Sequence, residues 1–201
     1  MATHTAWKHR VQDGLEPLQK QLLPRYRTTE RFRVYSSSLV PGVLQTEPYA
    51  KAVLGVAARK QGLAVDDSAK AAKVRVERGQ VIHDHGRQFE FLLEEPVLLY
   101  QMAGTEAMKA QLNHLLEADA LPTVSLGIIP KATPERQHWP EETFHIYDDR
   151  QVNVELVSAD VDLTESSEVA SYIAAFEALR SMAVYRTQAR ELVLRAIESL
   201  H

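Results

Sequence analysis

Two arginines and two glutamates stand where their side chains could act on a ligand. Arg75 and Arg78 are three residues apart in a segment expected to be helical, so they share one helix face. Such a pair can clamp a carboxylate or a phosphate, although arginines on a surface more commonly form ordinary ion pairs. Glu95 lies where a buried strand becomes a short helix. Glu155 lies opposite the apolar side of its strand, so it faces either water or a second, polar cavity.

The chemistry that these groups permit is carboxylate-driven hydrolysis. In cleavage of a glycosidic bond, one carboxylate can activate water while the other protonates the leaving group or stabilises the transition state. The chain has no cysteine, no Gly-x-Ser-x-Gly motif, no Gly-rich phosphate loop and no zinc-ligand spacing. His83 and His85 lack a third ligand nearby, and a solvated helix end explains them better than a metal site. We therefore expect no metal and no cofactor.

The segment around Pro41-Gly42 is expected to position further polar groups. Alternation over residues 32–35, which end in Tyr35, indicates a strand, and Pro41-Gly42 is a turn signal. Apolar residues at helical spacing follow the turn. Gln45, Thr46 and Tyr49 lie at this junction, where a rigid base would aim them outward.

The remaining elements alternate along the chain. Apolar spacing predicts one helix over 7–23 that ends at Pro24, and a second over 68–84. Strands are predicted at 88–94, 123–129, 143–147 and 151–157, the last two as a hairpin. We predict an α+β fold in which an antiparallel sheet of four to five strands is covered by helices and followed by a C-terminal helical pair. Residues 1–32 would form an N-terminal helix and linker, and residues 33–201 a single ligand-pocket domain.

Composition narrows the function class. The 201 residues are 45% hydrophobic, carry a net charge of −4 and have a pI of about 6.1. A nucleic-acid binder usually presents a basic surface, so this balance argues against one. The chain has neither a signal-peptide pattern nor an apolar run long enough to span a membrane. We expect a cytoplasmic protein without a membrane partner, and the apolar stripes near the C-terminus favour a homodimer.

Several of these motifs occur together in one known family. In chain order they are Val40-Pro-Gly-Val-Leu-Gln-Thr-Glu-Pro-Tyr-Ala50, Arg75-x-x-Arg78, Glu95-x-x-Leu98, Met108-x-x-Gln-Leu-x-His-Leu115, Val124 to Pro130, Phe144 and Asn153-Val-Glu155. Over about residues 33–195 the chain resembles the domain of unknown function that follows the helix-turn-helix in actinobacterial XRE-family, antitoxin-like regulators. Gly79 departs from the pattern, since the family commonly has Gln directly after its second Arg. Residues 1–32 are too few for a helix-turn-helix bundle, so the family's DNA-binding role is not expected here.

The resemblance implies a set of site residues and leaves two functions open. It places Gln45, Tyr49, Arg75, Arg78, Glu95 and Glu155 at motif positions, and Thr46 and Tyr35 join them as substrate-binding candidates. In the first interpretation, Glu95 and Glu155 are paired catalytic residues of an N-ribosidase that acts on a nucleotide-like molecule. In the second, the domain is a non-catalytic regulatory module that binds a small molecule or a partner protein, and not DNA by itself.

Overall fold

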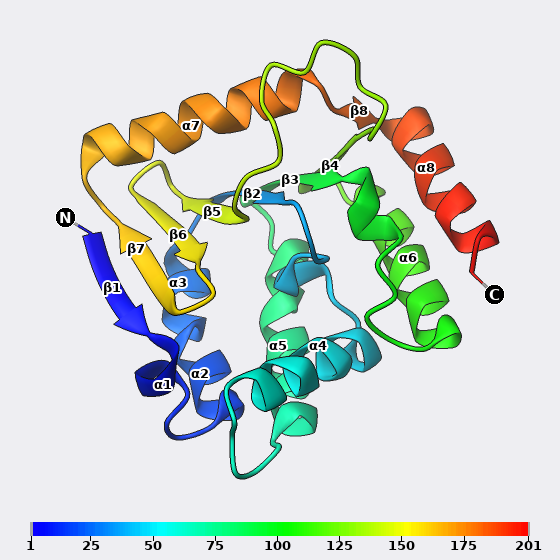
Figure 1. Ribbon diagram of the computed structural model, residues 1–201. Helices are drawn as coiled ribbons and strands as arrows, with labels where there is room; N and C mark the ends of the chain where they lie inside the picture. Colours follow the sequence, from blue (N-terminus) through cyan, green and yellow to red (C-terminus); the bar gives the residue numbers. More distant parts are fainter. Residues whose placement is uncertain (1, 201) are drawn as a thin grey trace.

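The computed structural model describes residues 2–200 and contains one large mixed sheet (Figure 1). Within these residues the sheet has eight strands in the order β1-β7-β6-β5-β2-β3-β4-β8. The strands are β1 (Ala2–Ala6), β2 (Arg31–Ser36), β3 (Gln88–Glu94), β4 (Val124–Ile129), β5 (Phe144–Tyr147), β6 (Gln151–Glu155), β7 (Ala159–Leu163) and β8 (Val184–Tyr185). The α-helices are α1 (Trp7–Arg10), α2 (Leu15–Gln21), α3 (Leu23–Thr28), α4 (Glu47–Lys60), α5 (Ser68–Gly79), α6 (Thr105–Asp119), α7 (Ser166–Ser181) and α8 (Arg186–Glu198). Short 3₁₀ turns are η1 (Gly42–Leu44), η2 (Gln80–His83) and η3 (Glu95–Leu98).

The predicted antiparallel sheet of four to five strands was wrong, although the fold is α+β. Strands β2, β3 and β4 pair in parallel, and the rest of the sheet is antiparallel. The segments that join β2 to β3 and β3 to β4 contain helices α4, α5 and α6. A strand followed by a helical crossover and another strand is the pattern of a parallel pair. The near-continuous apolar run of β4 is typical of a strand buried on both faces.

Three strands, β1, β7 and β8, were not predicted, because their sequences lack the composition or the length that is typical of strands. β1 is Ala-Thr-His-Thr-Ala, and β7 is Ala-Asp-Val-Asp-Leu, in which aspartate is unfavourable for a strand. β8 has only two residues. β1 pairs with β7 over residues 2–6, so the N-terminal segment extends the sheet at its edge.

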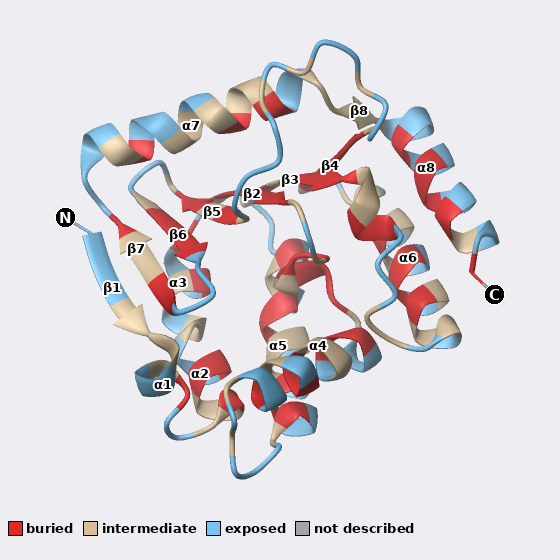
Figure 2. Cartoon of the chain, in the orientation of Figure 1, coloured by how far each residue is buried: buried red, intermediate tan, exposed pale blue. Residues whose placement is uncertain are grey.

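The sheet has apolar residues on both faces, and its central strands are almost wholly buried (Figure 2). Phe32, Val34, Phe89 and Phe91 pack on one face, together with side chains of α6 and α8. Tyr35, Leu92, Phe144, Ile146, Val152 and Val154 face α7 on the other. Because successive side chains of a strand alternate, His145, Asn153 and Glu155 point away from α7.

Both predicted C-terminal helices are present, as α7 and α8, but they belong to different hydrophobic clusters. α7 packs through Val169, Phe176 and Leu179 on the cluster that contains Phe144. α8 packs through Leu192 and Val193 in the core on the opposite face. The two helices are joined through β8 and cover different parts of the molecule (Figure 1). The apolar stripe of each C-terminal helix therefore covers a different face of the sheet.

No helix in residues 2–200 has the length and apolar character that a membrane span requires.

The helix predicted over 7–23 is broken at Gly14, whose φ of +104° lies outside the helical region. Asp67 then caps the next helix from a distant loop, because its carboxylate accepts hydrogen bonds from the backbone N–H groups of Leu15 (3.0 Å) and Glu16 (2.8 Å). Pro24 does not end a helix but lies in the first turn of α3, where a missing N–H costs nothing. These breaks orient α2 against α5.

Candidate functional site

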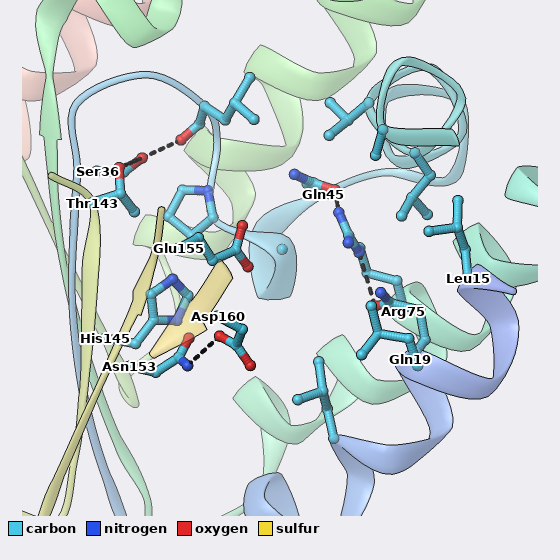
Figure 3. A pocket seen from close by; sticks show the side chains of 18 of the residues that line it. Leu15, Gln19, Ser36, Gln45, Arg75, Thr143, His145, Asn153, Glu155 and Asp160 are labelled. Carbon is cyan, nitrogen blue, oxygen red and sulfur yellow. Dashed lines mark hydrogen bonds between the residues drawn. The ribbon is translucent and has the colours of Figure 1, made fainter. Parts of the chain in front are cut away.

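A cavity of about 520 Å³ lies on the face of the sheet opposite α7. Its walls come from α2, α4 and α5, from the loop after β2, and from the β5, β6 and β7 strands. This volume is in the range of pockets that hold small molecules. Figure 3 shows Gln45, Arg75 and Gln19 on one side of the cavity and His145, Asn153, Glu155 and Asp160 on the other.

The arginine wall comes from α5. Arg75 Nε and Arg78 Nη1 both donate to the side-chain oxygen of Gln19, at 3.1 and 3.0 Å. Arg75 Nη1 also donates to the side-chain oxygen of Gln45 at 2.9 Å. Arg78 is 4% exposed, and its guanidinium lies over the ring of Tyr26 with its carbon 4.5 Å from the centroid. Among the described residues, neither arginine forms an ion pair, so their hydrogen-bond partners are neutral groups.

Burial of this wall affects its acid–base behaviour. Removal from water and the neighbouring charge of Arg78 together lower the pKa of Arg75 to about 10, while Glu155 opposes the shift. Arg75 is still protonated at neutral pH. Two positive charges therefore lie side by side in a partly desolvated wall, with no ion-pair partner among residues 2–200 and with Glu155 acting on Arg75 from across the cavity. A bound anionic group would stabilise this arrangement.

The turn after β2 forms a second wall, and hydrogen bonds fix its shape. The side-chain nitrogen of Gln45 donates to the carbonyl oxygen of Val40 at 2.7 Å, which leaves the amide oxygen for Arg75. The Tyr49 hydroxyl accepts from Val40 N–H at 3.3 Å. Thr46 N–H donates to the side chain of Gln111 at 2.8 Å. Thr46 and Tyr49 are not among the lining residues, so they shape the turn and do not face the cavity.

The acidic wall comes from the β6–β7 hairpin. Glu155 and Asp160 are cross-strand partners. Asp160 Oδ1 accepts from Asn153 Nδ2 at 2.6 Å, and Asp160 Oδ2 pairs with Arg10 Nη2 at 2.7 Å. Glu155 has no hydrogen bond or ion pair within residues 2–200, and its carboxylate projects into the cavity (Figure 3).

Glu155 and His145 have shifted pKa values. Desolvation by the cavity walls raises the pKa of Glu155, Asp160 adds to the rise, and Arg75 opposes it. Burial, and then the positive charges of Arg78, Arg25 and Arg75, lower the pKa of His145 to about 4. His145 is therefore neutral at pH 7. The cavity thus contains one free carboxylate that holds its proton more tightly than usual and one imidazole that can accept a hydrogen bond.

The predicted pairing of Glu95 with Glu155 is not present. Glu95 lies at the start of η3, where its carboxylate accepts from Lys131 N–H at 2.8 Å, and it does not line the cavity. Tyr35 also lies elsewhere, because its side chain faces α7. Its hydroxyl donates to the buried carboxylate of Glu94 at 3.0 Å, and Glu94 is also paired with Arg136. Burial and the charge of Glu94 raise the pKa of Tyr35.

The structure therefore brings Gln45, Arg75, Arg78 and Glu155 together and leaves Thr46, Tyr49, Tyr35 and Glu95 outside the cavity. Further polar residues complete the site: Arg10, Gln19, His145, Asn153 and Asp160. The alternation that placed Glu155 on a polar face also applied to Asn153 and could have identified it. His145 had the same signal, since it alternates with Phe144 and Ile146. No sequence signal identified Gln19 and Arg10, because their contacts with the site depend on how α1 and α2 pack. No group of metal-binding side chains occurs in residues 2–200.

Comparison with known proteins identifies a family. A family model described as "Domain of unknown function (DUF5753)" matches residues 23–195. No curated protein matches the chain. Among solved structures, NucT from Helicobacter pylori aligns with a TM-score of 0.50 at 8% identity, over 92% of this chain and 99% of that one.

Two further solved structures align more weakly. Nuc from Salmonella typhimurium, a phospholipase D family member, has a TM-score of 0.47 at 9% identity, over 92% of this chain and 97% of that one. TrmBL2, an archaeal chromatin protein, has a TM-score of 0.43 at 12% identity, over 92% of this chain and 54% of that one. At these identities the comparisons concern the fold alone.

Proposed function

The chain belongs to the DUF5753 family, and we propose that it binds a small anionic molecule as a non-catalytic regulatory module that does not contact DNA by itself. The resemblance to the domain that follows the helix-turn-helix in XRE-family regulators supports this proposal, and so does the net charge of −4. In such a module the pocket would report the presence of its ligand to a partner.

One observation carries the proposal: Arg75 and Arg78 face a cavity, and neither forms an ion pair with a residue in 2–200. Gln19 and Gln45 accept their hydrogen bonds as neutral amides, and the charge of Glu155 acts on Arg75 only from the opposite wall. An isolated buried charge is unfavourable, and a ligand carboxylate or phosphate would relieve that cost through charge-assisted hydrogen bonds. Glu155, Asn153 and Asp160 on the facing wall would contact the polar remainder of such a ligand.

The test is calorimetric titration with inorganic phosphate, acetate and adenosine 5′-monophosphate, with the wild-type chain and Arg75→Gln. Loss of one charge-assisted contact should weaken anion binding about tenfold or more, as expected for about 1.5–3 kcal/mol. Arg190→Gln is a matched control, because Arg190 is exposed on α8 and outside the cavity. Equal binding by Arg75→Gln and the wild type would refute anion recognition at this wall.

A second candidate function is hydrolysis of a glycosidic bond, proposed for an N-ribosyl bond of a nucleotide-like substrate. The observation that favours it is the contrast between two neighbouring carboxyl groups. Glu155 is unpaired with a raised pKa, whereas Asp160 is paired with Arg10. Such a difference in environment can keep one carboxyl group protonated, as a general acid, while its neighbour stays ionised. Glu155 would protonate the leaving nitrogen as its bond to the anomeric carbon breaks, and Asp160 would stabilise the positive charge that develops on the sugar. Water would then add to the anomeric carbon and return a proton to the Glu155 carboxylate.

The two candidates separate in a turnover assay. Incubation with a panel of nucleotides and nucleosides should release free base if the second candidate is right, and Glu155→Gln should abolish that release. Glu95→Gln serves as the control, because Glu95 lies outside the cavity. Binding without release across the panel would leave the regulatory module as the function.

A further inference from the structure

The cavity with Arg75 and Glu155 also has an apolar side. Six partly or fully exposed aliphatic side chains form it, and we call them the apolar strip: Leu39, Val53, Val56, Met102, Leu156 and Val157. Val157 at the hairpin tip is 79% exposed, and Leu156 and Val56 are 43% and 38% exposed. Exposed apolar residues are common singly, but here they converge on one opening from α4, the hairpin tip and two loops.

The aromatic residues around the cavity are poorly placed to stack on a nucleobase. Tyr26 and Tyr147 are 5% and 6% exposed. The Arg78 guanidinium lies 4.5 Å from the Tyr26 ring centroid, and that of Arg25 lies 5.2 Å from the centroid of Tyr147. Proteins that bind single bases usually offer open aromatic faces. Two other aromatic rings are among the described lining residues: the His145 imidazole, and the Trp7 indole, whose N–H donates to Leu156 O at 2.8 Å.

A second, more open cavity of about 410 Å³ continues the same surface. It shares Val56 and Met102 with the first cavity. Small side chains of α4 and α6 form part of its remaining wall, including Ala52 and Ala107, and Lys51, Arg59 and Asp66 also line it. An extended alkyl chain that follows the apolar strip therefore reaches Val56 and Met102 and can continue along the small side chains of α4 and α6.

We propose that the ligand is an acidic amphiphile, whose anionic head binds Arg75 and Arg78 and whose unbranched aliphatic chain lies along the apolar strip. This inference rests on the proposed anion-binding function and specifies the ligand class. Aliphatic side chains bury an alkyl chain without needing directional partners, and each buried methylene contributes about 0.8 kcal/mol. The head is a carboxylate or a phosphate monoester, which two guanidinium groups bind with the same chemistry.

The experiment is titration with a series of straight-chain acids from butanoate to decanoate, below their micelle concentrations, with octyl phosphate as the second head group. Affinity should increase about fourfold for each added methylene, from the constant above. Octanol, which has the chain without the charge, should bind at least tenfold more weakly than octanoate. Adenosine 5′-monophosphate should bind more weakly than decanoate.

Variants at the exposed end of the apolar strip test where the alkyl chain of the ligand lies. The double variant Val56→Ser, Val157→Ser should weaken decanoate binding about fivefold or more and leave butanoate binding within twofold. Val65→Ser is the matched control, because Val65 is 74% exposed and lines neither cavity. All three side chains are exposed, so these substitutions should leave the fold intact.

The outcomes separate this inference from the function on which it rests. If butanoate and decanoate bind equally and Arg75→Gln weakens both, the alkyl chain has no binding site on the protein. The inference is then overturned, while anion binding stands. If the nucleotide binds more tightly than decanoate, the inference is also overturned. If octanol matches octanoate and Arg75→Gln changes neither, anion recognition itself fails.

Discussion

At the scale of single residues, the site depends on the positive charges of Arg75 and Arg78, which form no ion pair with residues 2–200. They contribute to the state of His145, because burial, and then the charges of Arg78, Arg25 and Arg75, hold the pKa of this imidazole at about 4, below its usual 6.5. Between these two values the unfolded chain binds a proton that the folded chain does not, so stability decreases as the pH falls from 6.5 towards 4. Above pH 6.5 both states are neutral at this residue, and the effect vanishes.

Replacement of His145 by glutamine should therefore reduce the acid sensitivity of the fold. One pKa unit corresponds to 1.36 kcal/mol, and after allowance for partial solvent access we expect a difference on the order of 1–2 kcal/mol at pH 4.5. The measurement is urea unfolding of the wild type and His145→Gln at pH 7.5, 5.5 and 4.5. His114→Gln is a control on a partly exposed surface. Parallel loss of stability in the wild type and His145→Gln would contradict this assignment.

Gln19 is the second residue-scale test. It is 2% exposed, and its side-chain oxygen accepts from both guanidinium groups. Gln19→Ala would leave a part-buried donor of Arg75 and a buried donor of Arg78 without that acceptor, which should destabilise the fold by about 1–3 kcal/mol. Gln188→Ala on the exposed side of α8 should change stability by less than about 0.5 kcal/mol. Thermal unfolding distinguishes the two, and an equal effect would show that Gln19 is not needed to hold the arginines.

At the scale of elements, the arginine helix is positioned by a close backbone contact. Gly79 ends α5 and packs against η1, and a Cβ atom at this position would lie 2.7 Å from the carbonyl oxygen of Val43. Backbone cannot move away as easily as a flexible side chain. The departure of Gly79 from the family pattern therefore permits α5 to approach the turn, and this approach sets the distance between Arg75 and Gln45.

Gly79→Ala should destabilise the fold by about 1–3 kcal/mol, because the overlap forces α5 away from η1 despite the higher helix propensity of alanine. Anion affinity should fall as well, since Arg75 would move relative to the turn. Gly104→Ala is the control, because that position has open space and an ordinary φ of −62°. Chemical denaturation and phosphate titration measure the two effects. Unchanged stability in Gly79→Ala would exclude a tight contact.

Local spacing predicted some elements of the site and could not predict others. The interval between Arg75 and Arg78 specifies a shared helix face, and alternation in β6 specifies the polar side of Glu155, because both depend on backbone period alone. Backbone period could not indicate that Glu94 is buried while its neighbour Glu95 lies outside the cavity, since the strand ends between them. Parallel pairing of β2 with β3 requires a long crossover, whose path depends on contacts between distant residues. The position of Gln19 in the site likewise depends on contacts between residues that are distant in the sequence.

At the scale of the whole molecule, the N-terminal segment closes the cavity and is attached to the hairpin. β1 pairs with β7, the Trp7 indole donates to Leu156 O, and Arg10 pairs with Asp160 at 2.7 Å. These contacts join the first residues of the chain to the acidic wall, while Gln19 joins α2 to the arginine wall. A ligand that bridges the two walls would therefore also stabilise the N-terminal segment.

Arg10→Gln tests this connection. The side chain of Asp160 is 7% exposed and would keep Asn153 as its partner, so we expect a loss of about 1–3 kcal/mol, less than for a fully buried ion pair. Amide hydrogen exchange in β1 should become faster, because the local opening of an edge strand costs less once its neighbouring contact is lost. Lys8→Gln removes an equal charge from the exposed side of α1 and should leave that exchange unchanged.

Addition of an anion that spans both walls should slow the exchange of β1 in the wild type and much less in Arg10→Gln. Equal slowing in both chains would show that the ligand acts through α2 alone and that the Arg10–Asp160 pair does not transmit its binding.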